Sequence, residues 1–204
     1  IKVKVNNKIF DSRNNCNAII ETKSNVLLKG CINTIIPDEV IEIAPKAFYY
    51  SEISEINIPK NIEMIGELAF SKCVNLNKII IDKENEIYAS YDANVIVEKE
   101  TNKLLFGCTT SVIPSEVIEI ASYAFDGLDT LTEVHIPEGV KIIDSYAFTE
   151  CNSLETILLP ESIELIDIMA FNDSFDDNEV DFRPFRSVNV TTSGDTYYKV
   201  IESN

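Results

Sequence analysis

The chain has 204 residues, of which 34 are acidic and 17 are basic, so its formal net charge is −17 at pH 7. An acid excess of this size repels nucleic acid and anionic membranes, and neutral, basic or cation-bridged partners are expected instead. No apolar run reaches the 18 or more residues of a membrane-spanning helix, so no membrane insertion is predicted. The chain opens at Ile1 without methionine, and we expect that a preceding segment has been removed.

Residues 1–30 are predicted to form an N-terminal hairpin cap. IKVKV and AIIETKSNVLL supply alternating apolar runs, with a polar turn at residues 22–25. The pattern returns 77 positions later, where ANVIVEKETNKLLFGC at 93–108 matches CNAIIETKSNVLLKGC at 16–31. The chain is therefore a duplicated block. We expect the second hairpin, near residues 83–107, either to project from the fold or to extend its sheet.

One short unit recurs along the rest of the chain. LTEVHIPEGVKIIDSYAFTEC at 131–151 returns as LETILLPESIELIDIMAFNDS at 154–174. In five copies a proline precedes a phenylalanine by 11 positions: Pro37 and Phe48, Pro59 and Phe70, Pro114 and Phe125, Pro137 and Phe148, Pro160 and Phe171. A fixed short period of this kind predicts a solenoid, in which each unit packs only on its neighbours.

The copy at residues 131–151 indicates how one coil should fold. LTEVHI has the L-x-x-L-x-L spacing, so alternation turns its apolar residues inward and leaves Glu133 and His135 outward on a strand. The following proline ends the strand because it cannot donate a ladder hydrogen bond. A short return segment at 140–143 and one turn of α or 3₁₀ helix that buries Phe148 should complete the coil.

Six coils are predicted within residues 31–176. They are counted from the residue that begins each strand, namely Cys31, Ile53, Leu76, Cys108, Leu131 and Leu154. In the third coil Asp82 replaces the proline, and the sequence runs into the second hairpin. Residues 177–204 lose the repeat and are expected to form a C-terminal cap with a strand at SVNVT and a short terminal helix. The prediction for 1–204 is a single leucine-rich-repeat solenoid of the α/β horseshoe class, β-rich with little regular helix, with a parallel strand ladder and two hairpin insertions.

The unit x-I-P-x-x-V-x-x-I-x-x-x-A-F-x-x-C-x-x-L resembles the BspA-like leucine-rich repeat family. It is carried by IPKNIEMIGELAFSKCVNL at 58–76 and IPEGVKIIDSYAFTECNSL at 136–154. The inserted hairpin also resembles one that recurs in that family. The resemblance implies a secreted or cell-surface protein, mostly of bacteria and some protists, with several members implicated in adhesion to host proteins or other cells. It implies no catalytic residues.

The residues that could take part in catalysis or metal binding are better explained by structural roles. A Cys–His nucleophilic site would need a cysteine beside the single histidine, His135, but all five cysteines except Cys16 map to inward repeat positions while His135 maps outward. No phosphate-binding, hydrolase, zinc or C-x-x-C motif occurs. The acidic run at 173–181 lacks the spacing and glycine of a calcium loop, which favours a solvated loop. We predict no catalytic residue, no cofactor and no metal site.

The candidate binding site is the outward side of the predicted ladder, expected to be concave. One outward column is largely apolar although it should face solvent, which usually marks an interaction site. The alternative is that β-branched residues simply favour strands. The predicted binding residues are Glu55, Asn57, Lys78, Ile80, Val112, Glu133, His135, Thr156 and Leu158.

The sequence thus predicts a monomeric, non-enzymatic binding or adhesion module for a protein or glycan, with a preference for a basic partner. Its central coils should matter most, because hot spots cluster near the centre of an interface. One alternative is a structural spacer without a ligand of its own. Another is a hydrolase, which would need a polar pocket that the repeat does not supply. The second hairpin is the next candidate surface.

Overall fold

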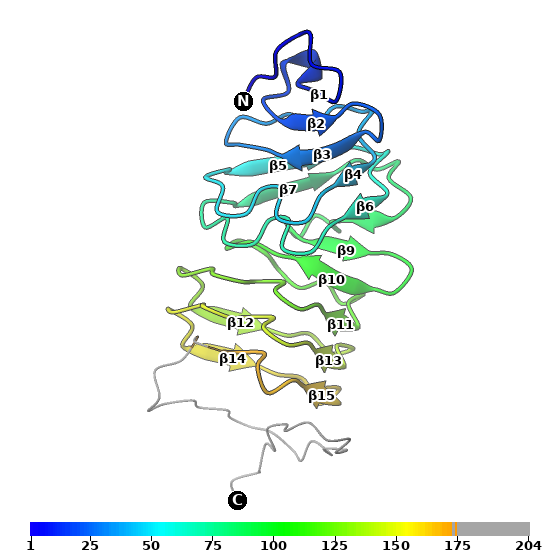
Figure 1. Cartoon of the computed structure of the whole chain (residues 1–204). Helices are drawn as coiled ribbons and strands as arrows, with labels where there is room; N and C mark the ends of the chain where they lie inside the picture. Colours follow the sequence, from blue (N-terminus) through cyan, green and yellow to red (C-terminus); the bar gives the residue numbers. More distant parts are fainter. Residues whose placement is uncertain (173, 175–204) are drawn as a thin grey trace, which may run out of the picture.

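A computed structural model of the chain describes residues 1–172 and Ser174 (Figure 1). These residues form a stack of short strands and turns that contains no α-helix and one 3₁₀ turn, η1 at Arg13–Asn15. The leucine-rich-repeat solenoid with little regular helix is therefore confirmed. The expected C-terminal cap at 177–204 lies outside the described residues, as does the acidic run at 173–181 apart from Ser174.

One side of the stack carries the strands that begin the coils (Figure 1). These strands are β5 (Glu55–Ile58), β7 (Lys78–Ile81), β12 (Glu133–His135) and β14 (Thr156–Leu158). β5 pairs with β7 and β12 pairs with β14, both in parallel and with partners 23 residues apart. We call the outward side of these strands, together with residues 31–36 and 108–113, the ladder face.

The parallel ladder is confirmed, but it comes in two pieces. The first and fourth coils, which directly follow the hairpins, contain no regular strand at the ladder position. In these two coils, backbone N–H groups donate hydrogen bonds to the preceding hairpin segment. The Ile35 N–H donates to the Cys16 carbonyl at 3.1 Å, and 77 positions later the Val112 N–H donates to the Ala93 carbonyl at 3.0 Å. The duplication therefore interrupts the ladder twice in the same way.

The opposite side carries the return segments and the hairpins in two sheets. The first sheet has the order β1 (Phe10–Asp11), β2 (Ile19–Glu21), β3 (Val26–Lys29), β4 (Glu42–Ile43) and β6 (Met64–Ile65). The second has the order β15 (Leu165–Ile166), β13 (Ile142–Ile143), β11 (Glu119–Ile120), β10 (Lys103–Phe106), β9 (Ile96–Glu98) and β8 (Tyr88–Ala89). The antiparallel hairpins β2–β3 and β9–β10 continue in parallel into β4 and β11. Each hairpin thus extends a sheet, which is one of the two expected outcomes.

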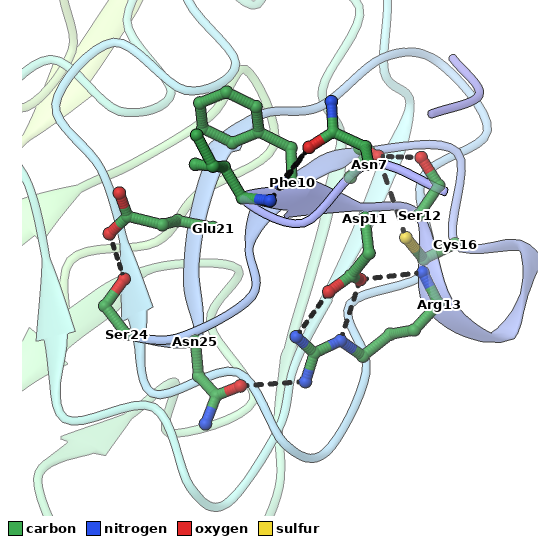
Figure 2. A network of polar contacts seen from close by, with 11 residues as sticks. Asn7, Phe10, Asp11, Ser12, Arg13, Cys16, Glu21, Ser24 and Asn25 are labelled. Carbon is green, nitrogen blue, oxygen red and sulfur yellow. Dashed lines mark hydrogen bonds and ion pairs between the residues drawn. The ribbon is translucent and has the colours of Figure 1, made fainter. Parts of the chain in front are cut away.

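The N-terminal segment departs from the sequence prediction. IKVKV at 1–5 forms no strand, because the chain turns at once: the Asn7 N–H donates to the Lys4 carbonyl at 2.9 Å and Val5 is fully exposed. The cap is held instead by Arg13, which donates to both Asp11 carboxylate oxygens at 2.9 and 2.7 Å and to Asn25 Oδ1 at 2.8 Å (Figure 2). The Arg13 guanidinium lowers the pKa of Asp11 to about 2.

The repeat phenylalanines form an aromatic column in the core. Phe48 and Phe148 are fully buried. Ring centroids lie 5.2 Å apart for Phe48 and Phe70, 4.8 Å for Phe125 and Phe148, and 5.3 Å for Phe148 and Phe171. At the second hairpin, Phe106 of β10 meets Phe70 edge-on at 5.5 Å. Two glycines admit these rings, because a Cβ on Gly30 would lie 2.1 Å from the Phe48 ring and one on Gly107 would lie 2.2 Å from the Phe125 ring.

The turn that carries each phenylalanine is not the helical turn expected from the sequence. In the fifth coil, the Phe148 N–H donates to the Ala170 carbonyl of the next coil at 2.8 Å rather than within its own segment. Tyr146 and Glu150 have φ of 60° and 54°, in the left-handed region. Because alternate donors are directed between coils, they are not available for a helix.

The cysteine that follows the phenylalanine by three positions has a polar role. The Cys73 thiol donates to the Phe48 carbonyl at 3.0 Å and the Cys151 thiol to the Phe125 carbonyl at 3.1 Å, each in the preceding coil. Ser174 does the same toward Phe148. The predicted burial of these positions is confirmed. Each position holds a small side chain with a hydrogen-bond donor because it contacts a backbone carbonyl of the preceding coil. All five cysteines are free thiols.

Candidate functional site

The structure places all nine predicted binding residues on the ladder face with exposed side chains. The strand register pairs Glu55 with Lys78, Asn57 with Ile80, Glu133 with Thr156 and His135 with Leu158. Val112 lies in the fourth coil, where the ladder is interrupted, between these two groups. The residues therefore share one face, but they are divided into two groups of four around Val112.

The outward column that was expected to be apolar does face solvent. The exposed fractions are 74% for Ile35, 38% for Ile80, 69% for Val112 and 41% for Leu158. The neighbouring column is polar, and in it Lys78 Nζ lies 3.1 Å from Glu55 Oε2 with about half of each side chain exposed. Such an exposed ion pair contributes little to stability. The outward column is thus aliphatic at four of its six positions, and Asn57 and His135 occupy the other two.

A hollow of about 250 Å³ opens on the ladder face at the ends of β5 and β7, beside residues 34–36 of the first coil. Ile35, Asn57 and Ile80 line it together with Asp38 and Asp82. We call it the ladder hollow. Its lining combines aliphatic and acidic residues, which suits a basic side chain beside an apolar one.

A second hollow, of about 420 Å³, lies where the ladder breaks between β7 and residues 88–94. We call it the β7 hollow. Sequence reasoning missed it, because its far wall depends on how the stretch after β7 folds before the second hairpin begins. The sequence feature that could have indicated this hollow is Asp82, which occupies the position where the other coils have a proline.

A Cys–His nucleophilic pair does not form. His135 is exposed on the ladder face, whereas Cys73 and Cys151 are buried in the core. Burial raises the pKa of the Cys73 thiol to about 11 and that of Cys151 to about 12, so both stay protonated at neutral pH and are poor nucleophiles. Cys16, the cysteine outside the predicted inward positions, is also buried.

Within residues 1–172 and Ser174, no group of three or more His, Cys, Asp or Glu side chains is arranged to hold a metal ion. The same residues contain no helix long and apolar enough to cross a membrane.

One buried charged cluster joins the coils on either side of the second hairpin. Asp126 is only 5% exposed and accepts a hydrogen bond from Ser71 on Oδ2, while no donor of the described chain reaches Oδ1. Beside it, Lys72 pairs with Glu150 and lies 5.4 Å from the centroid of the Tyr50 ring. Burial raises the pKa of Asp126 above its ordinary value, against the opposing effects of Ser71 and Lys72. The cluster is a structural junction rather than a binding site, because its members are held by one another.

Replacing Asp126 with asparagine is expected to stabilise the protein at neutral pH by about 1 kcal/mol, because the neutral amide keeps an oxygen for the Ser71 hydroxyl and removes the buried charge. The carboxyl has a raised folded-state pKa, so it is protonated in both states below 3.8 and imposes its cost only as pH rises through the folded-state value. Urea unfolding of both proteins between about pH 3.5 and pH 7.5 measures the effect. The stability difference should grow with pH, and a difference independent of pH would contradict the assignment.

The chain is similar to several solved structures. A leucine rich cell surface protein from Faecalibacterium prausnitzii A2-165 is 29% identical with a TM-score of 0.55, over 67% of this chain and 43% of that one. The T. pallidum leucine rich repeat protein is 22% identical with a TM-score of 0.44, over 79% and 84% of the two chains. The pneumococcal vaccine antigen PcpA is 24% identical with a TM-score of 0.43, over 66% and 46%.

The chain thus spans less than half the length of the Faecalibacterium protein. No curated protein matches the chain in sequence. A family description does match: the BspA type leucine rich repeat region fits residues 26–92 and 102–198 in six copies. With the stacked coils and the aromatic column described above, this match shows that the chain belongs to the BspA-type leucine-rich repeat family.

Proposed function

We propose that the chain is the protein-binding part of a secreted or cell-surface protein and that it binds through the ladder face. The observation that carries the proposal is the column of exposed aliphatic side chains formed by Ile35, Ile80, Val112 and Leu158. Solenoids of this class act as non-catalytic scaffolds that present extended surfaces to partners. The cell-surface description of the similar Faecalibacterium protein supports the location.

The partner's chemistry follows from the charges around the column. The chain carries a net charge of −17, and Asp38 and Asp82 line the ladder hollow beside Ile35 and Ile80. This combination suits a protein surface on which lysine or arginine stands next to an aliphatic or aromatic residue. A glycan partner and a spacer without a ligand remain the alternatives, and they are outcomes of the test.

The test is the double variant Ile80→Lys with Val112→Lys, assayed against a panel of immobilised extracellular matrix proteins and a glycan array. Two hot-spot residues each contribute about 2 kcal/mol or more, so binding of any matrix protein should fall at least about 100-fold. The melting temperature should stay within about 1 °C, because both side chains are exposed and carry no core.

The matched control is Met64→Lys with Ile118→Lys. These residues are similarly exposed, at 56% and 40%, but they belong to the return side of the stack, and they add the same charge. Equal loss in both double variants would reveal an effect of charge rather than of the ladder face. A ladder variant that binds like the wild type would refute the proposal and favour the hairpin at 93–106. A wild-type chain that binds glycans alone, or nothing, would favour the respective alternative.

A further inference from the structure

The ladder hollow carries charge of one sign. Its lining includes the carboxylates of Asp38 and Asp82 and no basic side chain. The lysines that adjoin this lining in sequence, Lys60 and Lys83, line other hollows. Lys60 Nζ lies 2.6 Å from Glu84 Oε2, and Glu84 rather than either aspartate is the main cause of its raised pKa. The hollow therefore holds two negative charges that no lining cation offsets.

Only one of the two aspartates is explained by the local backbone. Asp82 Oδ1 accepts a hydrogen bond from the Glu84 N–H at 2.9 Å, which holds the turn after β7. Asp38 is exposed, and within residues 1–172 and Ser174 no donor bonds to its carboxylate; Asn61 Nδ2 donates to its backbone carbonyl instead, at 2.8 Å. The carboxylate of Asp38 and Oδ2 of Asp82 are thus acceptors that the described fold does not use.

Aliphatic side chains line the same hollow as these acceptors. They belong to Ile35 and Ile80, which are 74% and 38% exposed. Asn57 pairs with Ile80 in the strand register and donates from Nδ2 to Glu55 Oε1 at 3.3 Å, which leaves its Oδ1 without a donor from the described chain. A lysine side chain combines the same two properties, because it has an apolar stem of methylene groups and a charged head.

Size and donor geometry favour lysine over other guests. The hollow, at about 250 Å³, is smaller than the roughly 300–1,000 Å³ of sites that enclose a small-molecule ligand, so it suits one side chain presented by a larger partner. Arginine binds a carboxylate best side-on through both oxygens, and at Asp82 one oxygen is already occupied. The lysine ammonium carries three separate donors, which suit acceptors on different side chains.

We propose that the ladder hollow receives a single lysine side chain of the partner protein, with its stem against Ile35 and Ile80 and its ammonium at Asp38 and Asp82. The inference rests on the proposed function and names the group that this part of the ladder face recognises. Acetylation neutralises a lysine, so a partner acetylated at that residue should lose the contact.

The experiment titrates the intact wild-type chain with Nα-acetyl-lysine N-methylamide at constant ionic strength and follows the backbone amide signals by heteronuclear NMR. The signals of Asn57 and Asp82 should shift and saturate. The norleucine derivative keeps the stem but lacks the ammonium, so it should bind about tenfold more weakly, and the arginine derivative should bind at least about threefold more weakly. Shifts that do not saturate, or equal affinity for either of the other two derivatives, would overturn the proposal.

The matched protein variants are Asp38→Asn with Asp82→Asn, and Glu116→Gln with Glu161→Gln as the control. Asparagine keeps an oxygen for the Glu84 N–H, so the first pair should keep the wild-type melting temperature within about 2 °C while its affinity for the lysine derivative falls at least about tenfold. The control removes the same charge from exposed positions outside the lining and should bind like the wild type. Equal loss in both pairs, or no loss in the first, would overturn the proposal.

The same variants separate this inference from the proposed function. If the aspartate pair still bound matrix proteins at wild-type strength while Ile80→Lys with Val112→Lys did not, the lysine site would be refuted and the proposed function would stand. If the wild-type chain bound the lysine derivative as expected but no matrix protein, the proposed function would fail while the hollow kept its assigned guest.

Discussion

Replacing Phe148 with alanine is expected to lower the free energy of unfolding by about 3–5 kcal/mol, as for other buried aromatic residues truncated to alanine. Phe148 is fully buried and its ring is stacked between those of Phe125 and Phe171, at 4.8 and 5.3 Å. Its loss would leave a void in a column that its neighbours cannot close without shifting a whole coil. At this chain length the melting temperature should fall by roughly 10 °C.

Urea unfolding followed by circular dichroism measures the Phe148 effect, with His135→Ala as the control in the same coil. His135 is exposed on the ladder face, so its replacement should leave stability within about 0.5 kcal/mol. If the Phe148 variant unfolded at the same urea concentration as the His135 variant, the aromatic column would not be the structural core.

Replacing Gly107 with alanine is the second large effect that we expect, a loss of about 2–3 kcal/mol from overpacking. The added Cβ would lie 2.2 Å from Cε1 of Phe125, a ring that cannot move away because it stacks on Phe148. Gly107 is not among the residues with positive φ, so the cost is steric and not a matter of backbone conformation.

A double-mutant cycle with Phe125→Leu separates the Gly107 clash from other causes. Leucine withdraws the ring atoms that the new methyl group meets, so Gly107→Ala should cost at least about 1 kcal/mol less in that background. Gly30→Ala in the first block should behave like Gly107→Ala, since its Cβ would meet Phe48 at 2.1 Å. An undiminished cost in the leucine background would show that the clash is not the cause.

The spacing of the sequence repeats predicts the coils well because the same spacing sets the register between neighbouring strands. Counting back from each repeat-proline position, which Asp82 occupies in the third coil, placed Asn57 opposite Ile80 and His135 opposite Leu158, and the structure pairs them with partners 23 residues apart. A regular spacing marked by a proline in five of the six coils leaves little freedom for the register to slip. The outward orientation of the nine candidate residues follows from the same count.

The remaining features depend on contacts that no local pattern contains. A tyrosine at a positive φ, as at Tyr146, contradicts the usual preference of bulky residues and is imposed by hydrogen bonds to the next coil. The interruptions of the ladder arise because Ile35 and Val112 bond backward to the hairpins. The β7 hollow is the result of the second interruption, so the sequence predicts the apolar column of the candidate site but not its hollows.

The junction around Asp126 also limits where coils can be added to or removed from a solenoid of this kind. A coil that touches only its two neighbours is interchangeable, so a copy can be gained or lost while the others keep their packing. Lys72 and Glu150 bond directly from the second coil to the fifth, and Phe106 packs on Phe70 from outside the repeat. Coils can therefore be added beyond this junction without altering these contacts, whereas adding or removing a coil between the second and the fifth would break them.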